Sequence, residues 1–383
     1  MDREYVAGTY GRFPVELVSG KGSIVTDVNG KEYIDMGSGI GVTCFGFGDE
    51  AWSAAVAEQA AKLQHTSNLY YTEPCAMLAK LLCDRTGMKK VFFANSGAEA
   101  NECAIKVARK YSTQKKSEAY HTIITLKNSF HGRTLTTLAA TGQDKFHELF
   151  QPLTPGFAYV TANDVAELEK TVAETKAAGI MIECVQGEGG VIPLKPEFVK
   201  VASQLAKEQD IPLIVDEVQT GNGRTGMLYG YMHFNLQPDI VSTAKGLGGG
   251  LPIGATLMSE KVQNVLQPGD HGSTYGGNPV CCAGALSVIS RMDDNFLASV
   301  RRKSGYVFAS LYGAKGVESV TGLGLMVGIK TVKPARDVVN ACMERGVLCL
   351  TAKDKVRLLP ALNISMDELC KAIETIKSVC AEE

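Results

Sequence analysis

The sequence lacks the features that would place it in a membrane or on a nucleic acid. Its 383 residues contain no apolar run long enough to span a bilayer, and the first ten, MDREYVAGTY, begin with charges rather than with the apolar stretch of a secretory signal. The formal net charge is only −2, and no basic run is interleaved with aromatic residues. This argues against nucleic acid or an acidic membrane as the main partner. We therefore expect a soluble, cytoplasmic protein.

Cysteine and histidine do not form a recognisable disulfide or metal-binding pattern. The eleven cysteines are odd in number and irregular in spacing, they contain no C-x-x-C, and Cys281 and Cys282 are adjacent within an apolar segment. In a long chain without an export signal, such cysteines are typical of reduced core residues. The six histidines are scattered without the spacing of metal ligands. We therefore expect neither disulfides nor a bound metal.

What the sequence does contain is the composition of a globular protein that is long enough for two domains. Apolar residues make up 45% and charged residues 21% of the 383 positions. Residues 17–36 hold two β-rich runs separated by Asn29-Gly30, a strong hairpin signal. No internal repeat or low-complexity linker is visible. The hairpin predicts a small antiparallel element near the N-terminus.

From about residue 46 to 285, β-rich segments alternate with helical ones. VFFAN precedes AEANECAIKVARKYSTQ, AELEKTVAETKAAG precedes IMIECVQ, and EFVKVASQLAKEQD precedes PLIVDEV. This alternation predicts a mostly parallel sheet covered by helices. Beyond residue 285, a helical run, the short strands GLGLMVGIK and VRLLPAL and a final helix indicate a smaller domain. We predict an α/β protein with a large domain at 46–285, an α+β domain at 286–383, and an N-terminal segment at 1–45 that joins the smaller domain.

Two predicted strand ends carry an acid and a lysine. Asp216 ends the apolar run of PLIVDEVQTGNGRTG, and Lys245 follows the β-branched run of PDIVSTAKGLGGGLPIGA. A pyridine aldehyde cofactor requires these two groups: the acid keeps the ring nitrogen protonated, and the lysine amine forms a Schiff base with the aldehyde. The pair therefore indicates an enzyme that uses pyridoxal phosphate.

A phosphate site is indicated between a strand and a helix in FANSGAEANECAIK. Ser96, Gly97 and Ala98 are small residues at a helix start, where unpaired backbone N–H groups and the helix dipole favour a phosphate. An ordinary capped helix start, with Ser96 or Glu99 satisfying the first turn, remains an equal alternative.

Two further loops carry groups that suit a flat, anionic ligand. In KNSFHGRTLTTLAATG, Phe130 is suited to stacking on a ring and Arg133 to gripping a carboxylate, with His131 between them. Val218 would pack on the opposite ring face, and Gln219 would reach the ring hydroxyl. Taken alone, an F-x-x-R pattern is more often a core aromatic followed by a surface charge.

The remaining candidates are carboxylates, a lone arginine and a hydroxyl loop. Glu183 and Glu188 lie at a strand end in IECVQGEGGVIPL, where open parallel sheets place their ligands. Arg357, on the apolar strand KVRLLPAL, needs a partner or a ligand unless it points to water. GDHGSTYGGNP offers Ser273 and Thr274 as phosphate donors, although such loops are often plain turns.

Together, the order and spacing of these motifs resemble the class III, or ω-amino acid, aminotransferases over essentially the whole chain. The family pattern stands here as SGAEANE, FHGRT, VQGEGG, DEVQTG-GRTG, AKGLGGGLPIGA and HGSTYGGNP. The resemblance implies the aspartate aminotransferase-type fold (fold type I), pyridoxal 5′-phosphate as cofactor, and a homodimer with active sites at the subunit interface.

The resemblance also assigns roles to individual residues. Lys245 and Asp216 are implied as the catalytic lysine and the partner of the ring nitrogen. Further cofactor contacts are implied for Gly97, Ala98, Phe130, Glu217, Val218 and Gln219, and for Thr274 reaching over from the second subunit. Substrate contacts are implied for Arg133 and Arg357 as carboxylate binders, Glu188 as the acid that pairs with Arg357, and Glu183, Ser273 and Tyr10 around them.

Within this family the sequence is most similar to members that transfer the δ-amino group of N-acetylornithine to 2-oxoglutarate. Ornithine, succinylornithine, N-acetyl-lysine-type amines and 4-aminobutyrate remain alternative substrates, because relatives acting on them share these motifs. Two departures from the family pattern bear on the substrate rather than on the cofactor. Cys184 stands where the family usually has proline, and SGIGVTCFGFGDEAW replaces the usual segment, so that an Asn and a His are missing.

Overall fold

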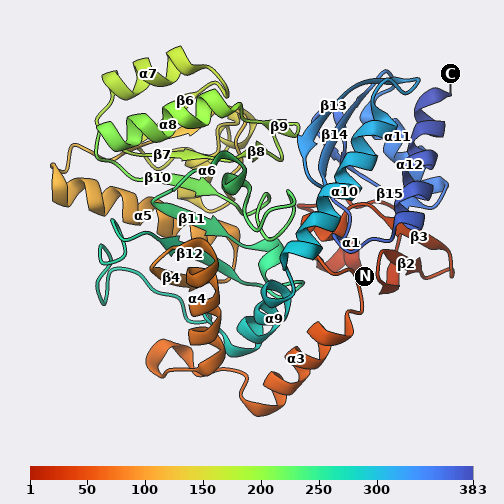
Figure 1. Ribbon diagram of the computed structural model, residues 1–383, viewed down its shortest axis with the longest axis horizontal. Helices are drawn as coiled ribbons and strands as arrows, with labels where there is room; N and C mark the ends of the chain where they lie inside the picture. The colour runs from red at the N-terminus through yellow and green to blue at the C-terminus, as the bar shows by residue number, and fades with distance from the viewer. Residues whose placement is uncertain (383) are drawn as a thin grey trace.

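A computed structural model describes residues 1–382, and its largest element is a seven-stranded sheet with the order β4-β12-β11-β10-β7-β5-β6 (Figure 1). The pairs from β11 to β6 are parallel, whereas β12 runs antiparallel to both of its neighbours. The predicted mostly parallel sheet is thereby confirmed. Its strands are β4 (Lys90–Ala94), β5 (Thr122–Leu126), β6 (Phe157–Val160), β7 (Ala177–Ile182), β10 (Leu213–Asp216), β11 (Ile240–Thr243) and β12 (Gly254–Met258).

Helices bury both faces of this sheet because its strands are apolar on both sides. Met181, Ile214 and Ile240 pack with the apolar stripe of α5, whereas Leu213 and Val215 point to the face covered by α8. Figure 1 shows α7 and α8 together on one side of the sheet. Helices in this part of the chain are α3 (Glu50–Lys62), α4 (Glu73–Thr86), α5 (Gly97–Lys115), α6 (Leu135–Ala140), α7 (Val165–Glu174), α8 (Pro196–Glu208) and α9 (Pro279–Ser290). Two-sided burial is what a parallel sheet requires.

Two four-stranded sheets lie beside the large one, with orders β1-β2-β3-β15 and β13-β14-β17-β16. The strands are β1 (Leu17–Lys21), β2 (Ile24–Asp27), β3 (Glu32–Asp35), β13 (Val317–Leu323), β14 (Met326–Thr331), β15 (Val347–Leu348), β16 (Leu350–Ala352) and β17 (Lys355–Leu358). They pack with α10 (Asp294–Leu311), α11 (Ala335–Glu344) and α12 (Met366–Ala381). Parallel pairing of β3 with β15 joins the N-terminal segment to the C-terminal part of the chain. The domain limits themselves stay a prediction.

Short elements complete the described chain. They are the helical turns α1 (Asp2–Tyr5) and α2 (Ser38–Gly41), the two-residue strands β8 (Val185–Gln186) and β9 (Ile192–Pro193), and the 3-10 turns η1 (Ser67–Leu69), η2 (Asp144–Phe146), η3 (Gly230–Phe234) and η4 (Lys245–Leu247). No helix within residues 1–382 combines the length and the apolar character needed to cross a membrane.

Three predicted elements differ in the structure. Residues 17–36 form three strands rather than two, because the chain also turns at Gly22. The predicted strand GLGLMVGIK is a hairpin: Gly324, at φ +61°, turns the chain between β13 and β14. Residues 177–179, predicted at the end of a helix, begin β7 instead. Their small side chains fit the crowded sheet interior, as the full burial of Ala178 illustrates.

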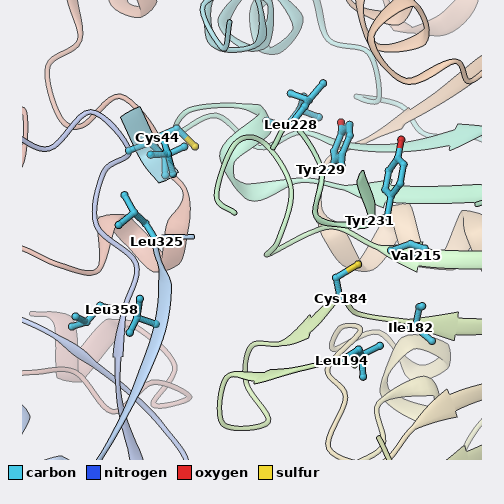
Figure 2. Packing of buried hydrophobic residues seen from close by; sticks show 14 of the residues in the cluster. Cys44, Ile182, Cys184, Leu194, Val215, Leu228, Tyr229, Tyr231, Leu325 and Leu358 are labelled. Carbon is cyan, nitrogen blue, oxygen red and sulfur yellow. The ribbon is translucent and has the colours of Figure 1, made fainter. Parts of the chain in front are cut away.

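One apolar cluster continues from the large sheet into the C-terminal strands. Figure 2 shows Ile182, Cys184 and Val215 on the large-sheet side of it, and Leu325 and Leu358 on the other. All eleven cysteines are free thiols; seven of them are buried, as predicted for core residues, and the other four are partly buried. This continuous core holds the two parts of the chain against each other where the candidate site lies.

Candidate active site

A cavity of about 470 Å³ lies where the carboxyl ends of the parallel strands meet. The first turn of α5 follows β4, the loop 127–133 follows β5, Glu183 follows β7, Asp216 ends β10 and Lys245 follows β11. Open parallel sheets place ligand sites at this edge. The lining includes nine predicted site residues: Gly97, Ala98, Phe130, Arg133, Glu183, Asp216, Val218, Gln219 and Lys245.

The carboxylate of Asp216 is buried and receives three hydrogen bonds. Asn101 Nδ2 and His131 Nδ1 both lie 2.7 Å from its Oδ2, and the backbone N–H of Val218 donates to Oδ1 at 2.9 Å. The Asp216 residue is only 3% exposed. Donors from α5, from the β5 loop and from its own turn therefore stabilise a negative charge at the floor of the cavity.

Burial and neighbouring charges shift the titration of two further groups at this floor. Burial lowers the pKa of His131, but its hydrogen bond and attraction to Asp216 raise the pKa more, so the net shift is upward. Burial raises the pKa of Glu183 to about 8, although the nearby His131 opposes the shift and Phe130 N–H donates to its carboxylate. One carboxylate on this floor thus accepts a proton readily, while His131 favours the imidazolium.

Lys245 has the environment of a reactive amine. Its backbone is left-handed, with φ at +45°, a strained conformation that occurs often at functional sites. Its Nζ makes no hydrogen bond or ion pair with any residue between 1 and 382. Burial lowers the pKa of this amine, and Arg357 adds to the effect, while Glu188 and Asp216 oppose it. The result is a lysine with an enlarged neutral fraction, as proton transfer requires.

The N-terminus of α5 offers backbone donors to the cavity. Ser96 accepts a hydrogen bond from Glu99 N–H and caps the helix, as the alternative interpretation proposed. Gly97 and Ala98 occupy the first helical positions, whose N–H groups have no partner within a helix. Both residues line the cavity. Capping and phosphate binding are thus compatible, because they use different N–H groups.

Arg357 and Glu188 form an ion pair beside the cavity, in which the arginine side chain is buried and that of Glu188 is 31% exposed. Arg357 Nη1 lies 2.6 Å from Glu188 Oε1 and 3.2 Å from Gln219 Oε1, and Gln219 in turn lines the cavity. Arg357 is 3% exposed. Its positive charge holds the pKa of Glu188 below the usual value despite burial. The sequence-based expectation that Glu188 is the acid partner of Arg357 agrees with this geometry.

Arg133 has a different setting at the same cavity. Its guanidinium lies over the rings of Phe146 and Phe130, at 4.3 and 5.4 Å from their centroids. It is exposed and has no acidic partner among residues 1–382. A cation held by aromatic faces remains available to a ligand carboxylate.

Besides Arg357 and Glu188, four predicted residues lie outside the cavity lining, and one of them is Glu217. The Glu217 carboxylate accepts hydrogen bonds from the N–H groups of Gly230 and Tyr231, at 2.9 and 2.7 Å, and is fully buried behind the site. The other three are Ser273, Thr274 and Tyr10. Ser273 Oγ is joined to the lining residue Asn95 at 3.1 Å, whereas Thr274 and Tyr10 are exposed.

Sequence analysis missed Asn101 and assigned no role to His131, although both bind Asp216. Asn101 lies one helical turn after Gly97, so it faces the same way, and a polar residue on a buried helix face was the available signal. His131 lies between Phe130 and Arg133, which were both predicted. Its ring nitrogen Nε2 is buried without a partner among the described residues.

The two departures from the family pattern have clear positions. Cys184 is fully buried, its Sγ lies 3.7 Å from Glu217 Oε1, and burial raises the pKa of its thiol, which makes it an inert packing residue. The unusual segment 38–52 contacts the lysine loop: Trp52 Nε1 donates to Gly248 O at 2.9 Å, and Cys44 Sγ lies 3.8 Å from Gly246 O. The segment therefore supports the loop of Lys245.

The His131–Asp216 contact predicts a pH-dependent contribution to stability. The folded pKa of His131 is raised, so this contribution is complete below the pKa of an unfolded histidine, about 6.5, and is lost as pH rises through the folded value. His131→Asn keeps a donor but has no titratable ring. The difference in unfolding temperature between the native chain and this variant should therefore be largest near pH 5.5 and shrink towards pH 9. In an Asp216→Asn background the same comparison should lose this pH dependence; a constant difference in both backgrounds would contradict the assignment.

The chain is similar to known proteins along its whole length. The acetylornithine aminotransferase of Haemophilus ducreyi is 50% identical and matches 100% of this chain and 98% of its own length. That of Clostridium acetobutylicum is 42% identical over 97% of this chain and 98% of its own. Among solved structures, the ornithine aminotransferase of Toxoplasma gondii, described with partial occupancy of PLP at its active site, has a TM-score of 0.94 at 32% identity, covering 99% of this chain and 93% of its own.

A further solved structure, the N-acetylornithine aminotransferase of Stenotrophomonas maltophilia, has a TM-score of 0.86 at 34% identity over 99% of this chain and 97% of its own. These likenesses confirm the fold-type I prediction, in which a large sheet carries the cofactor site. The model of the family "Aminotransferase class-III" matches residues 5–380. The chain therefore belongs to the class-III aminotransferases, which are pyridoxal-phosphate-dependent transferases.

Proposed function

We propose that this enzyme transfers the δ-amino group of N2-acetyl-L-ornithine to 2-oxoglutarate, giving N-acetylglutamate semialdehyde and glutamate as a step of arginine biosynthesis. The observation that carries the proposal is the ion pair of the buried Arg357 with Glu188, beside a cavity whose other arginine, Arg133, has no acidic partner in the described chain. The full-length likeness to acetylornithine aminotransferases supports the choice of amine.

The cavity residues fit pyridoxal phosphate. The free N–H groups of Gly97 and Ala98 suit its phosphate, Phe130 and Val218 suit its ring faces, and Asp216 suits its ring nitrogen. An orphaned donor and acceptor, His131 Nε2 and Asn101 Oδ1, lie buried beside that carboxylate. When bound, the cofactor supplies an electron sink for the carbanion that forms when the substrate loses a proton. Asp216 keeps that sink effective because its negative charge favours a protonated ring nitrogen.

Lys245 is the proposed base and acid of the reaction. Its lowered pKa provides a neutral Nζ that removes the proton from the substrate carbon bearing the amine. The same amine, once protonated, returns a proton at the end of the transfer. Because its Nζ has no hydrogen-bond partner in the described chain, no competing contact holds it away from the substrate.

Arg357 and Glu188 explain how one site accepts two unlike amino donors. Glutamate carries a carboxylate next to its reacting amine, and this group would displace Glu188 from Arg357. N-acetylornithine has no charge beside its δ-amine, so Glu188 stays on Arg357 and avoids an uncompensated buried charge, worth roughly 3–5 kcal/mol. In both cases the distal carboxylate binds Arg133.

We further place the enzyme in the cytoplasm as a homodimer whose active sites are shared. Eleven free cysteines fit a reducing compartment. Leu69, Tyr70 and Tyr71 are 82%, 73% and 105% exposed on consecutive positions, and exposed apolar groups of this kind mark protein interfaces. Thr274 is exposed and does not line the cavity of its own chain, as expected of a residue that completes the phosphate site of a second subunit.

Ornithine is the second candidate substrate, favoured by the TM-score of 0.94 with the Toxoplasma enzyme. The deciding experiment mixes the purified holoenzyme with N-acetylornithine, ornithine, succinylornithine or 4-aminobutyrate and follows the absorbance of the bound cofactor in a single turnover. The fastest change should occur with N-acetylornithine, and 2-oxoglutarate should reverse it. A faster change with ornithine would replace the proposed substrate and keep the reaction class.

Replacing Glu188 tests the proposed charge switch. Glu188→Gln leaves Arg357 without its counter-charge, so the half-reaction with N-acetylornithine should lose about 100-fold in kcat/KM, in line with roughly 3 kcal/mol. The glutamate half-reaction should change by less than about threefold, because glutamate brings its own carboxylate. Stopped-flow absorbance measures both half-reactions, and Glu174→Gln, an exposed acid at the end of α7, is the matched control. Equal losses in both half-reactions would refute the switch.

The proposed dimer interface is tested at Tyr71. Tyr71→Asp puts a charge into the exposed apolar run, so the variant should elute as a monomer in size-exclusion chromatography with light scattering. Activity should fall with the loss of the dimer, because Thr274 no longer reaches the second site. Tyr312→Asp, at another tyrosine that is 85% exposed, should remain dimeric. A dimeric and fully active Tyr71→Asp enzyme would place the interface elsewhere.

A further inference from the structure

Arg224 is a buried cation at the junction between the large sheet and the C-terminal strands. It is 1% exposed, forms no ion pair with a carboxylate among residues 1–382, and its Nε and Nη2 lack hydrogen-bond partners there. Burial lowers its pKa to about 10, so it still carries a charge at neutral pH. Burying a charge without a counter-ion costs free energy, so the few hydrogen bonds that the Arg224 guanidinium makes are strongly preferred to none. These hydrogen bonds therefore fix the position of the guanidinium.

These contacts all go to the part of the chain that carries Arg357. Arg224 Nη1 donates to Pro360 O at 2.6 Å and to Leu325 O at 3.2 Å, and Leu325 N–H donates back to Arg224 O at 3.0 Å. Pro360 lies three residues beyond Arg357, just after β17. Hydrogen bonds from a charged donor are the stronger kind. Arg224 thus fixes the chain immediately after the strand that presents the substrate-binding arginine.

Asn222, two residues earlier in the same turn, binds the strand that leads to Lys245. Its Nδ2 donates to Ala244 O at 3.0 Å and to Thr243 Oγ1 at 2.9 Å. The turn itself is packed tightly, since a Cβ on Gly324 would lie 2.4 Å from Thr225 Cα. In Figure 2, Leu325 and Leu358 lie near Cys44 on this side of the core, and Cys44 Sγ lies 3.7 Å from Asn222 O. One short turn therefore contacts both chain segments that carry the reacting groups.

From these contacts we propose that Arg224 is a positioning residue that sets the place of Arg357 relative to Lys245. Glutamate and 2-oxoglutarate need both groups at once, because the carboxylate beside the reacting carbon sits on Arg357 while Lys245 moves the proton at that carbon. A misplacement of about 1 Å is enough to cost up to 100-fold in rate. N-acetylornithine leaves Arg357 on Glu188 and is therefore much less sensitive to this distance.

Pairing of β17 with β14 and β16 also holds Arg357, so Arg224 acts only at the end of the strand. A purely structural Arg224 would lower the stability of the fold and weaken all substrates alike. A positioning Arg224 weakens the dicarboxylates selectively. The comparison with N-acetylornithine rests on the proposed function, whereas the affinity for a dicarboxylate does not.

The test uses two variants that disturb the same junction in different ways. Arg224→Lys keeps the charge but offers a shorter donor to the carbonyls of Leu325 and Pro360. Gly324→Ala leaves Arg224 intact and inserts a methyl group against Thr225. Gly313→Ala is the matched control, because Gly313 also has a positive φ, at +72°, but its Cβ would meet nothing within 4 Å.

The affinity of each holoenzyme for glutarate, a dicarboxylate without an amine, is measured by titration calorimetry, together with kcat and KM for 2-oxoglutarate and for N-acetylornithine. Both junction variants should bind glutarate about tenfold more weakly and raise KM for 2-oxoglutarate similarly, with kcat/KM for N-acetylornithine within about threefold. Gly313→Ala should match the native enzyme in all three.

Unchanged glutarate affinity in both junction variants, or equal losses for every ligand, would overturn the proposal. If one junction variant fails to fold, the other decides the outcome alone. If the native enzyme does not use N-acetylornithine, the proposed function fails, but the glutarate affinities still show whether Arg224 positions Arg357.

Discussion

The buried carboxylate of Asp216 constrains the whole site, because a charge at the end of the central strand β10 needs donors from several parts of the chain. Asn101 from α5 and His131 from the β5 loop both reach its Oδ2 at 2.7 Å. These donors meet only because α5 packs across the sheet and β5 lies two strands from β10. A stable anion at this position therefore depends on the strand order, on the packing of α5 and on the loop that carries His131.

The charged side chains around the cavity balance one another as a group and not only pair by pair. Asp216 faces His131, Glu188 faces Arg357, and Lys245 lies between the two pairs with a pKa that burial has lowered. Glu183, with a pKa of about 8, is mostly neutral at physiological pH and adds little negative charge. A neutral Lys245 is therefore compatible with its surroundings, whereas a further carboxylate would have favoured the ammonium form.

Sequence patterns predicted the residues that follow strand ends, since a run of apolar residues followed by a polar one marks the edge of a parallel sheet. Asp216, Lys245 and Glu183 were found in this way. Glu217 lies behind the site rather than in its lining, because side chains alternate along an extended chain and the neighbour of an inward-facing residue points to the other side. Contacts between distant segments, such as Asn101 with Asp216 or Arg224 with Pro360, follow from packing that no local pattern encodes.

The two arginines at the cavity suit the proposed substrates, which differ at one end only. Arg133 lies over aromatic faces and has no ion pair in the described chain, so in the proposed reaction a distal carboxylate reaches it without breaking one. Arg357 is buried and its charge is balanced by Glu188, so in the proposed reaction a substrate carboxylate binds it by replacing that of Glu188. Exchanging one carboxylate for another on Arg357 leaves the net charge of the site unchanged. It therefore costs less free energy than burying a carboxylate that has no counter-charge. β17 and the turn at Arg224 therefore hold Arg357 in a fixed position. Arg133 lies on a surface loop, where the exposure of its charge costs little free energy.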